Sequence, residues 1–180
     1  TIDDQRRIRP LAPHGYLVRH IRLLERGRLE QKNVLTDKSR QMRLTWAGAA
    51  YFLWCLMQLE AFTGFLTTRK QDLVDDGGEH STPKSIFGRI RFMWDRLPEH
   101  LRTPVTFTHM KASCEERTSY LFGEAPTEES GRSINVSRAL LDEAAKLPYD
   151  EETLAAVAPM CPTGMVLQST HNGPDTAFAR

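Results

Sequence analysis

Two adjacent carboxylates are the residues of this sequence whose types and position most clearly indicate chemistry. Asp142 and Glu143 follow a short apolar run in the segment SRALLDEAA, where a buried strand is predicted to end. Buried acids without partners are costly, so this position favours a functional role. We expect Asp142 to hold Mg²⁺, directly or through water, and Glu143 to orient and deprotonate an attacking water molecule.

The local geometry of this pair leaves an alternative open. Neighbouring strand residues point to opposite faces of a sheet, so the end of the strand must turn Glu143 inward for the two acids to act together. Both acids could instead cap the N-terminus of the next helix, where carboxylates are favoured. The dipeptide alone does not separate these two interpretations.

A polar loop with a phosphate-binding character lies earlier in the chain. Residues 37–43 follow a short predicted strand, residues 33–36, and precede a strongly apolar helix, residues 44–59. The N–H groups of a tight turn and of the helix start would form a concave site for the phosphates of a nucleotide. The alternative is an ordinary basic connection between a strand and a helix.

The octet KSRQMRLT of this loop aligns with the phosphate-loop pattern GxxxxGK[ST], although it lacks three of the usual residues. Thr45 matches the hydroxyl that coordinates Mg²⁺, while Lys38, Arg43 and Leu44 replace the two glycines and the lysine. Lys38 could fold its long side chain back over the same phosphates, with Arg40 nearby. Arg43 opposes the positive φ that glycine permits, which would weaken nucleotide affinity. The residues expected to bind nucleotide are Lys38, Ser39, Arg40, Gln41, Met42, Arg43, Leu44 and Thr45.

A third polar loop follows the last predicted strand. The segment VLQSTHNGP carries Ser169, Thr170 and Asn172 beyond the strand end, where they could sense a γ-phosphate or the attacking water. Taken alone, this segment is a simple Gly-Pro turn. Three such loops, each directly after a predicted strand, are more informative than any one of them.

The elements that must position these loops alternate along the chain. This alternation predicts an α/β fold with a mostly parallel sheet and helices on both faces, in which ligands bind beyond the carboxyl ends of the strands. The remaining predicted strands are residues 61–69, 104–110, 117–123, 134–141 and 164–170, with an acidic turn at 112–116. The remaining predicted helices are residues 15–27, stopped by Gly27, a helix opening at 70–76, residues 85–101, ended by Pro98, and residues 149–157. Residues 77–83 are predicted to be a mobile surface loop and residues 124–133 a polar linker.

Length and composition favour one domain spanning residues 1–180, with 40% hydrophobic and 26% charged residues. The net charge is only +1, but residues 1–46 carry eleven Lys and Arg against five Asp and Glu. Such a basic face could steer a nucleic acid or a nucleotide, or could simply be solvated. The longest apolar stretch, residues 46–59, is too short to cross a bilayer, so the chain is expected to be soluble.

The cysteines and histidines indicate no metal site. Cys55, Cys114 and Cys161 are odd in number and widely spaced, which favours free thiols. The six histidines show no ligand spacing, so any metal should arrive with a ligand.

The segments KSRQMRLTW, SRALLDEAA and LQSTHNGP, together with FLTTRKQD, IRFMWDRLP and GEAPTEESGR, resemble the N-terminal ATPase domain of the large terminase subunit of tailed bacteriophages. The resemblance covers nearly the whole chain. It implies a three-layer P-loop NTPase fold, with residues 1–32 as a leading helical segment. Some family members carry the phosphate-loop lysine at the start of the loop, as Lys38 stands here.

The same resemblance implies particular roles. Arg40 resembles the arginine of the phosphate loop, residues 169–172 the coupling motif, and Arg132 an arginine that acts across subunits. Two positions depart from the family pattern. Ser133 follows Arg132 where glycine is usual, and Gly15 stands where a glutamine contacts adenine.

The function implied by the resemblance is an ATPase that couples Mg-ATP hydrolysis to the movement of double-stranded DNA into a capsid. Its expected catalytic residues are Glu143, Arg40 and Arg132, with Thr45 and Asp142 as ligands of Mg²⁺ and ATP as the nucleotide. The expected partners are double-stranded DNA, a portal protein, a small terminase subunit and further copies in a ring, with no membrane. The expected location is the cytoplasm of an infected bacterium, and no C-terminal nuclease is assigned in this chain. Two alternatives remain: a degenerate ATPase-like module that docks DNA or portal, and a helicase-like translocase.

Overall fold

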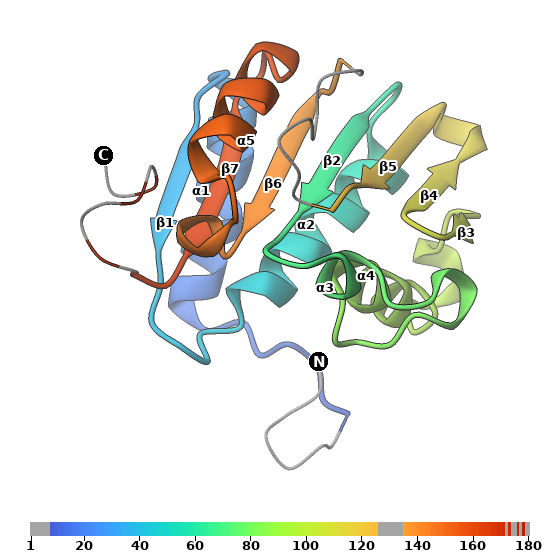
Figure 1. Ribbon diagram of the computed structural model, residues 1–180. Coiled ribbons are helices and arrows are strands. Elements are labelled where there is room, and N and C mark those ends of the chain that lie inside the picture. Colours follow the sequence, from blue (N-terminus) through green and yellow to red (C-terminus); the bar gives the residue numbers. More distant parts are fainter. Residues whose placement is uncertain (1–7, 126–134, 172, 174–175, 177, 179–180) are drawn as a thin grey trace.

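The computed structural model describes residues 8–125 and 135–171, together with residues 173, 176 and 178. A seven-stranded sheet with the order β1-β7-β6-β2-β5-β4-β3 forms its centre (Figure 1). The strands are β1 (Val34–Asp37), β2 (Thr63–Thr67), β3 (Thr106–Thr108), β4 (Lys111–Cys114), β5 (Ser119–Gly123), β6 (Arg138–Asp142) and β7 (Met165–Ser169). The α-helices are α1 (Gly15–Leu29), α2 (Leu44–Gln58), α3 (Gln71–Val74), α4 (Ile86–Trp94) and α5 (Asp150–Val157). None of these described helices is both long and apolar enough to cross a membrane.

Five neighbouring strands of the sheet run parallel. β1, β7, β6, β2 and β5 are paired in parallel, whereas β4 and β3 add an antiparallel edge. The predicted α/β fold with a mostly parallel sheet is therefore confirmed. The carboxyl ends of β1, β7, β6 and β2 consequently lie side by side at one edge of the sheet, where ligands bind in such folds.

Both faces of the sheet are covered, as predicted. On one face, α1, α2 and α4 share a core with Leu140 of β6 and Val166 of β7. On the other face, α5 and the 3₁₀ turn at Ala144–Lys146 pack with Leu141 and Leu167. Figure 1 shows α5 in front of β7, with α1 and α2 behind the sheet. Consecutive residues of β6 and β7 thus serve opposite cores, as the alternation of a strand requires.

Helix α2 is apolar nearly all round because it lies between the sheet and two other helices. Eleven of its fifteen residues are buried, among them Phe52 and Leu56. A helix without a polar face is stable only when it is enclosed on several sides. Its burial fixes the direction of its N-terminus, which follows the predicted phosphate loop.

Three predicted boundaries were wrong. Gly27 does not stop α1, which continues to Leu29; a Cβ at Gly27 would overlap the Val34 side chain, so glycine serves close packing. Helix α4 ends at Trp94 rather than at Pro98. Residues 112–114, predicted as part of a turn, form β4 because the neighbouring β5 supplies partners for their backbone groups.

The segment predicted as a mobile surface loop, residues 77–83, is tied to two aspartates. Asp75 Oδ1 accepts the N–H of Gly78 at 3.0 Å, and its Oδ2 accepts the N–H of Met110 at 2.7 Å. Asp76 Oδ1 accepts the N–H of Thr82 at 2.8 Å. These bonds give the segment a defined path into α4, which forms one wall of the cavity described below.

Candidate active site

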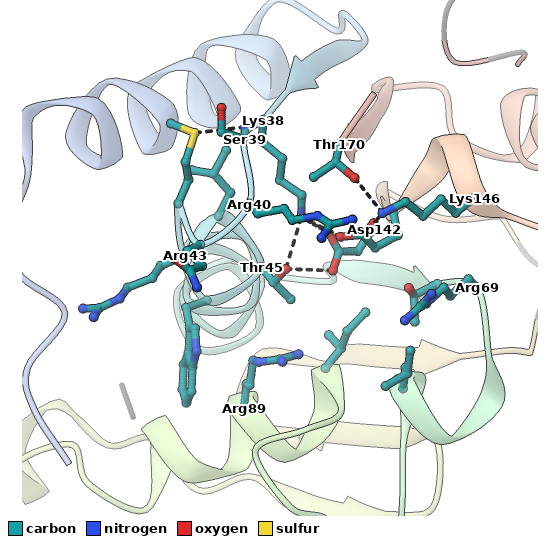
Figure 2. A pocket seen from close by; sticks show the side chains of 18 of the residues that line it. Lys38, Ser39, Arg40, Arg43, Thr45, Arg69, Arg89, Asp142, Lys146 and Thr170 are labelled. Carbon is teal, nitrogen blue, oxygen red and sulfur yellow. Dashed lines mark hydrogen bonds and ion pairs between the residues drawn. The ribbon is translucent and has the colours of Figure 1, made fainter. Parts of the chain in front are cut away.

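Four adjacent strand ends deliver side chains into one cavity of about 560 Å³ (Figure 2). Lys38 follows β1, Thr170 follows β7, Asp142 ends β6, and Arg69 comes shortly after β2. The segments that meet there are far apart in the sequence. The cavity is lined by residues 38–46 and by Thr68, Arg69, Leu73, Lys84, Ile86, Arg89, Asp142, Glu143, Lys146 and Thr170.

The Asp142 carboxylate is the centre of a hydrogen-bonded cluster. Its Oδ1 lies 2.8 Å from the Lys38 ammonium and 2.9 Å from Gln168 Nε2. Its Oδ2 accepts the hydroxyl of Thr45 at 2.8 Å, and Lys38 Nζ also lies 3.3 Å from Thr45 Oγ1. The side chains of Lys38 and Asp142 are only 6% and 7% exposed, so the two charges compensate each other away from bulk water.

The sheet register explains why Asp142 points toward α2. Asp142 is paired with Gln168 across β6 and β7. Both alternate with residues that pack under α2, Leu140 and Val166, so they face the same side of the sheet. Gly48 of α2 leaves room for this polar pair, because a Cβ there would lie 3.3 Å from Gln168 Nε2.

Glu143 reaches the same cavity through a change of backbone conformation. Its φ of 54° places it in the left-handed region, which ends β6 and breaks the strand alternation. Its Oε2 lies 2.6 Å from Lys146 Nζ, and its Oε1 lies 3.5 Å from Lys38 Nζ. Glu143 makes no side-chain capping bond to the following 3₁₀ turn. The helix-cap interpretation therefore receives no support from this geometry.

The phosphate loop adopts the conformation that its sequence opposes. Gln41 and Arg43 have φ values of 65° and 56°, so Arg43 occupies the left-handed region that favours glycine. The N–H of Lys38 donates to the Ser169 carbonyl at 2.8 Å, which fixes the start of the loop against β7. Leu44 begins α2 and packs its side chain with Leu17 in a small apolar cluster. The positive charge near Thr45 is therefore supplied by Lys38.

The cavity is strongly basic. Seven lysines and arginines line it against two carboxylates: Lys38, Arg40, Arg43, Arg69, Lys84, Arg89 and Lys146 face Asp142 and Glu143. Such a wall attracts a polyanion. The described residues contain no cluster of three or more His, Cys, Asp or Glu side chains that could hold a metal ion. The oxygens of Thr45 and Asp142 nevertheless suit Mg²⁺, which commonly takes one or two protein oxygens and completes its shell with phosphates and water.

Most predicted site residues meet in this cavity. All eight residues of the phosphate loop line it, as do Asp142, Glu143 and Thr170. Ser169 does not, because it is buried and its hydroxyl donates to the Thr170 carbonyl at 3.0 Å. Arg132 and Asn172 lie outside the described residues.

Three functional candidates were missed by sequence reasoning. Lys146 bonds both Glu143 and, at 2.6 Å, Thr170 Oγ1, and its position three residues after Glu143 was an available signal. Gln168 donates to Asp142, and Arg89 lines the opposite wall. Nothing local to these two residues indicated their position, because each is brought to the site by tertiary packing.

No protein-family model matches the chain, and no curated protein matches its sequence. Solved structures do match its fold. The large terminase of bacteriophage HK97 superposes with a TM-score of 0.73 and 11% identity over 96% of this chain, which spans 36% of that chain. The large terminase ATPase domain of Thermus phage P74-26 gives a TM-score of 0.62 and 18% identity, covering 93% of this chain and 72% of that one. A further chain of the same ATPase domain is covered to 62%.

A third structure is the large terminase of a thermophilic bacteriophage in complex with ADP. It matches with a TM-score of 0.64 and 11% identity over 91% of this chain and 40% of that one. The chain thus spans well under half the length of the two large terminases. At these identities the comparisons establish the fold, which is that of the terminase ATPase domains.

Proposed function

We propose that this chain is an ATP-hydrolysing domain that drives the packaging of viral double-stranded DNA. The observation that carries the proposal is the cluster of Lys38, Thr45 and Asp142 beside Glu143, at the carboxyl ends of parallel strands. A lysine, a hydroxyl and two carboxylates in a basic cavity are the groups that nucleotide hydrolysis requires. The fold shared with terminase ATPase domains supports the same conclusion.

The phosphates of ATP would lie against the phosphate loop. Lys38 and the amides at the start of α2 would hold them, with Arg40 adding positive charge. Thr45 and Asp142 would hold Mg²⁺, which neutralises charge on the phosphate oxygens when it is bound. In this arrangement Lys38 exchanges part of its contact with Asp142 for a phosphate oxygen.

Glu143 would act as the base. A water oxygen attacks the γ-phosphorus in line, the bond between that phosphorus and the β,γ-bridging oxygen breaks, and the water proton passes to Glu143. The products are ADP and inorganic phosphate. Lys146 fixes the Glu143 carboxylate through its 2.6 Å contact and links it to Thr170 after β7. This link supports a role for Thr170 in sensing the state of the nucleotide.

The proposed motor acts with partners that the chain alone does not contain. It would grip double-stranded DNA mainly through backbone phosphates, which predicts binding that weakens steeply as salt rises. The portal, the small terminase subunit and further copies in a ring would complete the machine in the bacterial cytoplasm. Arg132 is proposed as the arginine offered to a neighbouring copy.

The test is Mg²⁺-dependent ATP turnover by the purified chain, with and without double-stranded DNA. The wild type is compared with Glu143→Gln and Lys38→Ala, and with Glu152→Gln on the exposed side of α5 as a matched control. We expect turnover in the wild type and in the control, and a loss of at least about 100-fold in the two site variants. Equal background turnover in all four proteins would reject the enzyme.

A second candidate function is a nucleotide-binding docking module with little hydrolysis. Two observations favour it: the left-handed Arg43, and Leu44 packed into an apolar cluster where a lysine is usual. In that case the wild type would bind ATP while its turnover equalled that of Glu143→Gln. The same assay therefore separates the two functions.

A further inference from the structure

Arg89 is a residue of the cavity wall to which the proposed hydrolysis assigns no role. It projects from α4, on the side of the cavity opposite the phosphate loop, toward the region of Thr45 and Asp142 (Figure 2). Its Nε atom is buried and has no hydrogen-bond partner among the residues that the structure describes. A buried guanidinium nitrogen without an acceptor is costly, so it indicates an acceptor that a ligand would supply.

An aromatic ring holds Arg89 in this position. Its Cζ lies 5.7 Å from the centre of the Trp46 ring, which in turn packs edge-on against Phe92. Trp46 directly follows Thr45 in the first turn of α2. The ring therefore ties the guanidinium to the same helix turn that carries the phosphate-loop hydroxyl, and leaves its hydrogen-bond donors available.

The electrostatic surroundings of Arg89 also point to an anion. Burial lowers the pKa of Arg89, while the negative charges of Asp142 and Asp76 oppose that shift. Arginine nevertheless stays protonated at neutral pH. Lys84 and Arg69 line the same wall and add positive charge, so neighbouring side chains do not neutralise the guanidinium.

We propose that Arg89 binds the terminal phosphate of the nucleotide from the wall opposite the phosphate loop. The γ-phosphate is then held between Lys38 on one side and Arg89 on the other, within a single copy of the chain. A guanidinium suits this task because it donates two parallel hydrogen bonds to phosphate oxygens. The inference rests on the proposed function, since it assigns a residue to the same nucleotide.

The experiment compares affinities for ADP and for ATPγS, which differ in the terminal thiophosphate, by isothermal titration calorimetry with Mg²⁺. The variants are Arg89→Gln and Arg89→Lys. Arg91→Gln is the matched control, because Arg91 lies on the same helix with its guanidinium over Phe107 and does not line the cavity. We expect Arg89→Gln to weaken ATPγS binding by about 10-fold or more and ADP binding by less than about 3-fold, as loss of a charged hydrogen bond implies. Arg91→Gln should change neither.

Arg89→Lys keeps the positive charge and so guards against a folding defect in the glutamine variant. It should bind ATPγS with an intermediate affinity, because an ammonium cannot form the paired bonds of a guanidinium. Equal losses for ADP and ATPγS, or no loss for either, would overturn the role of Arg89 while leaving nucleotide binding intact. A wild type that binds neither nucleotide would instead reject the proposed function and this inference with it.

Discussion

The buried ion pair between Lys38 and Asp142 should be a large contributor to the stability of the nucleotide-free protein. Lys38→Met removes the ammonium and retains most of the side-chain volume. The Asp142 carboxylate, 7% exposed, would then keep two neutral donors among the described residues, Thr45 and Gln168. Breaking a buried pair by removing one partner costs about 3–5 kcal/mol. Because those two donors remain and a water-accessible cavity adjoins the site, we expect a loss of about 2–3 kcal/mol.

This loss is measurable by urea unfolding, followed by far-ultraviolet circular dichroism at neutral pH without nucleotide. For a chain of 180 residues it corresponds to a decrease in Tm of roughly 4–12 °C. The double variant Lys38→Met with Asp142→Asn removes both charges, so it should be more stable than the sum of the two single losses predicts. Lys32→Met is the matched control, since Lys32 is 71% exposed and pairs with Glu30 at the surface.

Two results would refute this reasoning. One is a Lys38→Met variant within about 0.5 kcal/mol of the wild type, which would mean that the pair is effectively solvated. The other is strict additivity in the double variant, which would mean that the two charges do not interact. A large loss in Lys32→Met would show that the assay responds to any lost lysine rather than to this pair.

Three further predictions concern the backbone, a histidine and the thiols. Arg43→Gly removes a left-handed non-glycine residue, so unfolding should require about 0.5–1 kcal/mol more free energy, and nucleotide should bind more tightly. Burial lowers the pKa of His20 below its ordinary 6.5, with Gln168 opposing and the charge of Lys38 assisting. Because the unfolded chain then binds the proton more readily, stability should fall as pH falls below about 6.5, and urea midpoints of His20→Phe should show less of this dependence. Burial raises the pKa of the Cys55 thiol to about 12 and that of Cys161 to about 11, so a thiol reagent should label them only after denaturation.

The fold was predictable because its signals are local. Apolar runs separated by polar loops identified most strands and helices, and a parallel sheet covered on both faces is the packing that this alternation favours. The errors occurred where a partner distant in the sequence decides the structure. Residues 112–114 form a strand because β5 lies beside them, and Gly27 continues a helix because Val34 packs against it.

The placement of the candidate site was predictable only in part. Polar loops after strands indicated Lys38, Thr45 and Asp142, since carboxyl ends of parallel strands share one edge. Gln168 was not indicated, because a glutamine inside a buried strand carries no local sign of its partner. Arg89 was not indicated either, because it reaches the cavity through the packing of α4 against α2 rather than through a strand end.

The sequence by itself determined which chemical groups stand at the strand ends, and it showed that the phosphate loop lacks its usual glycines and lysine. Only the tertiary structure decided that Lys38 lies 2.8 Å from Asp142, a residue 104 positions away. The physical reason is the strand order. Placing β7 between β1 and β6 sets the spacing of their ends, and the enclosed helix α2 presents its first turn to the gap between them.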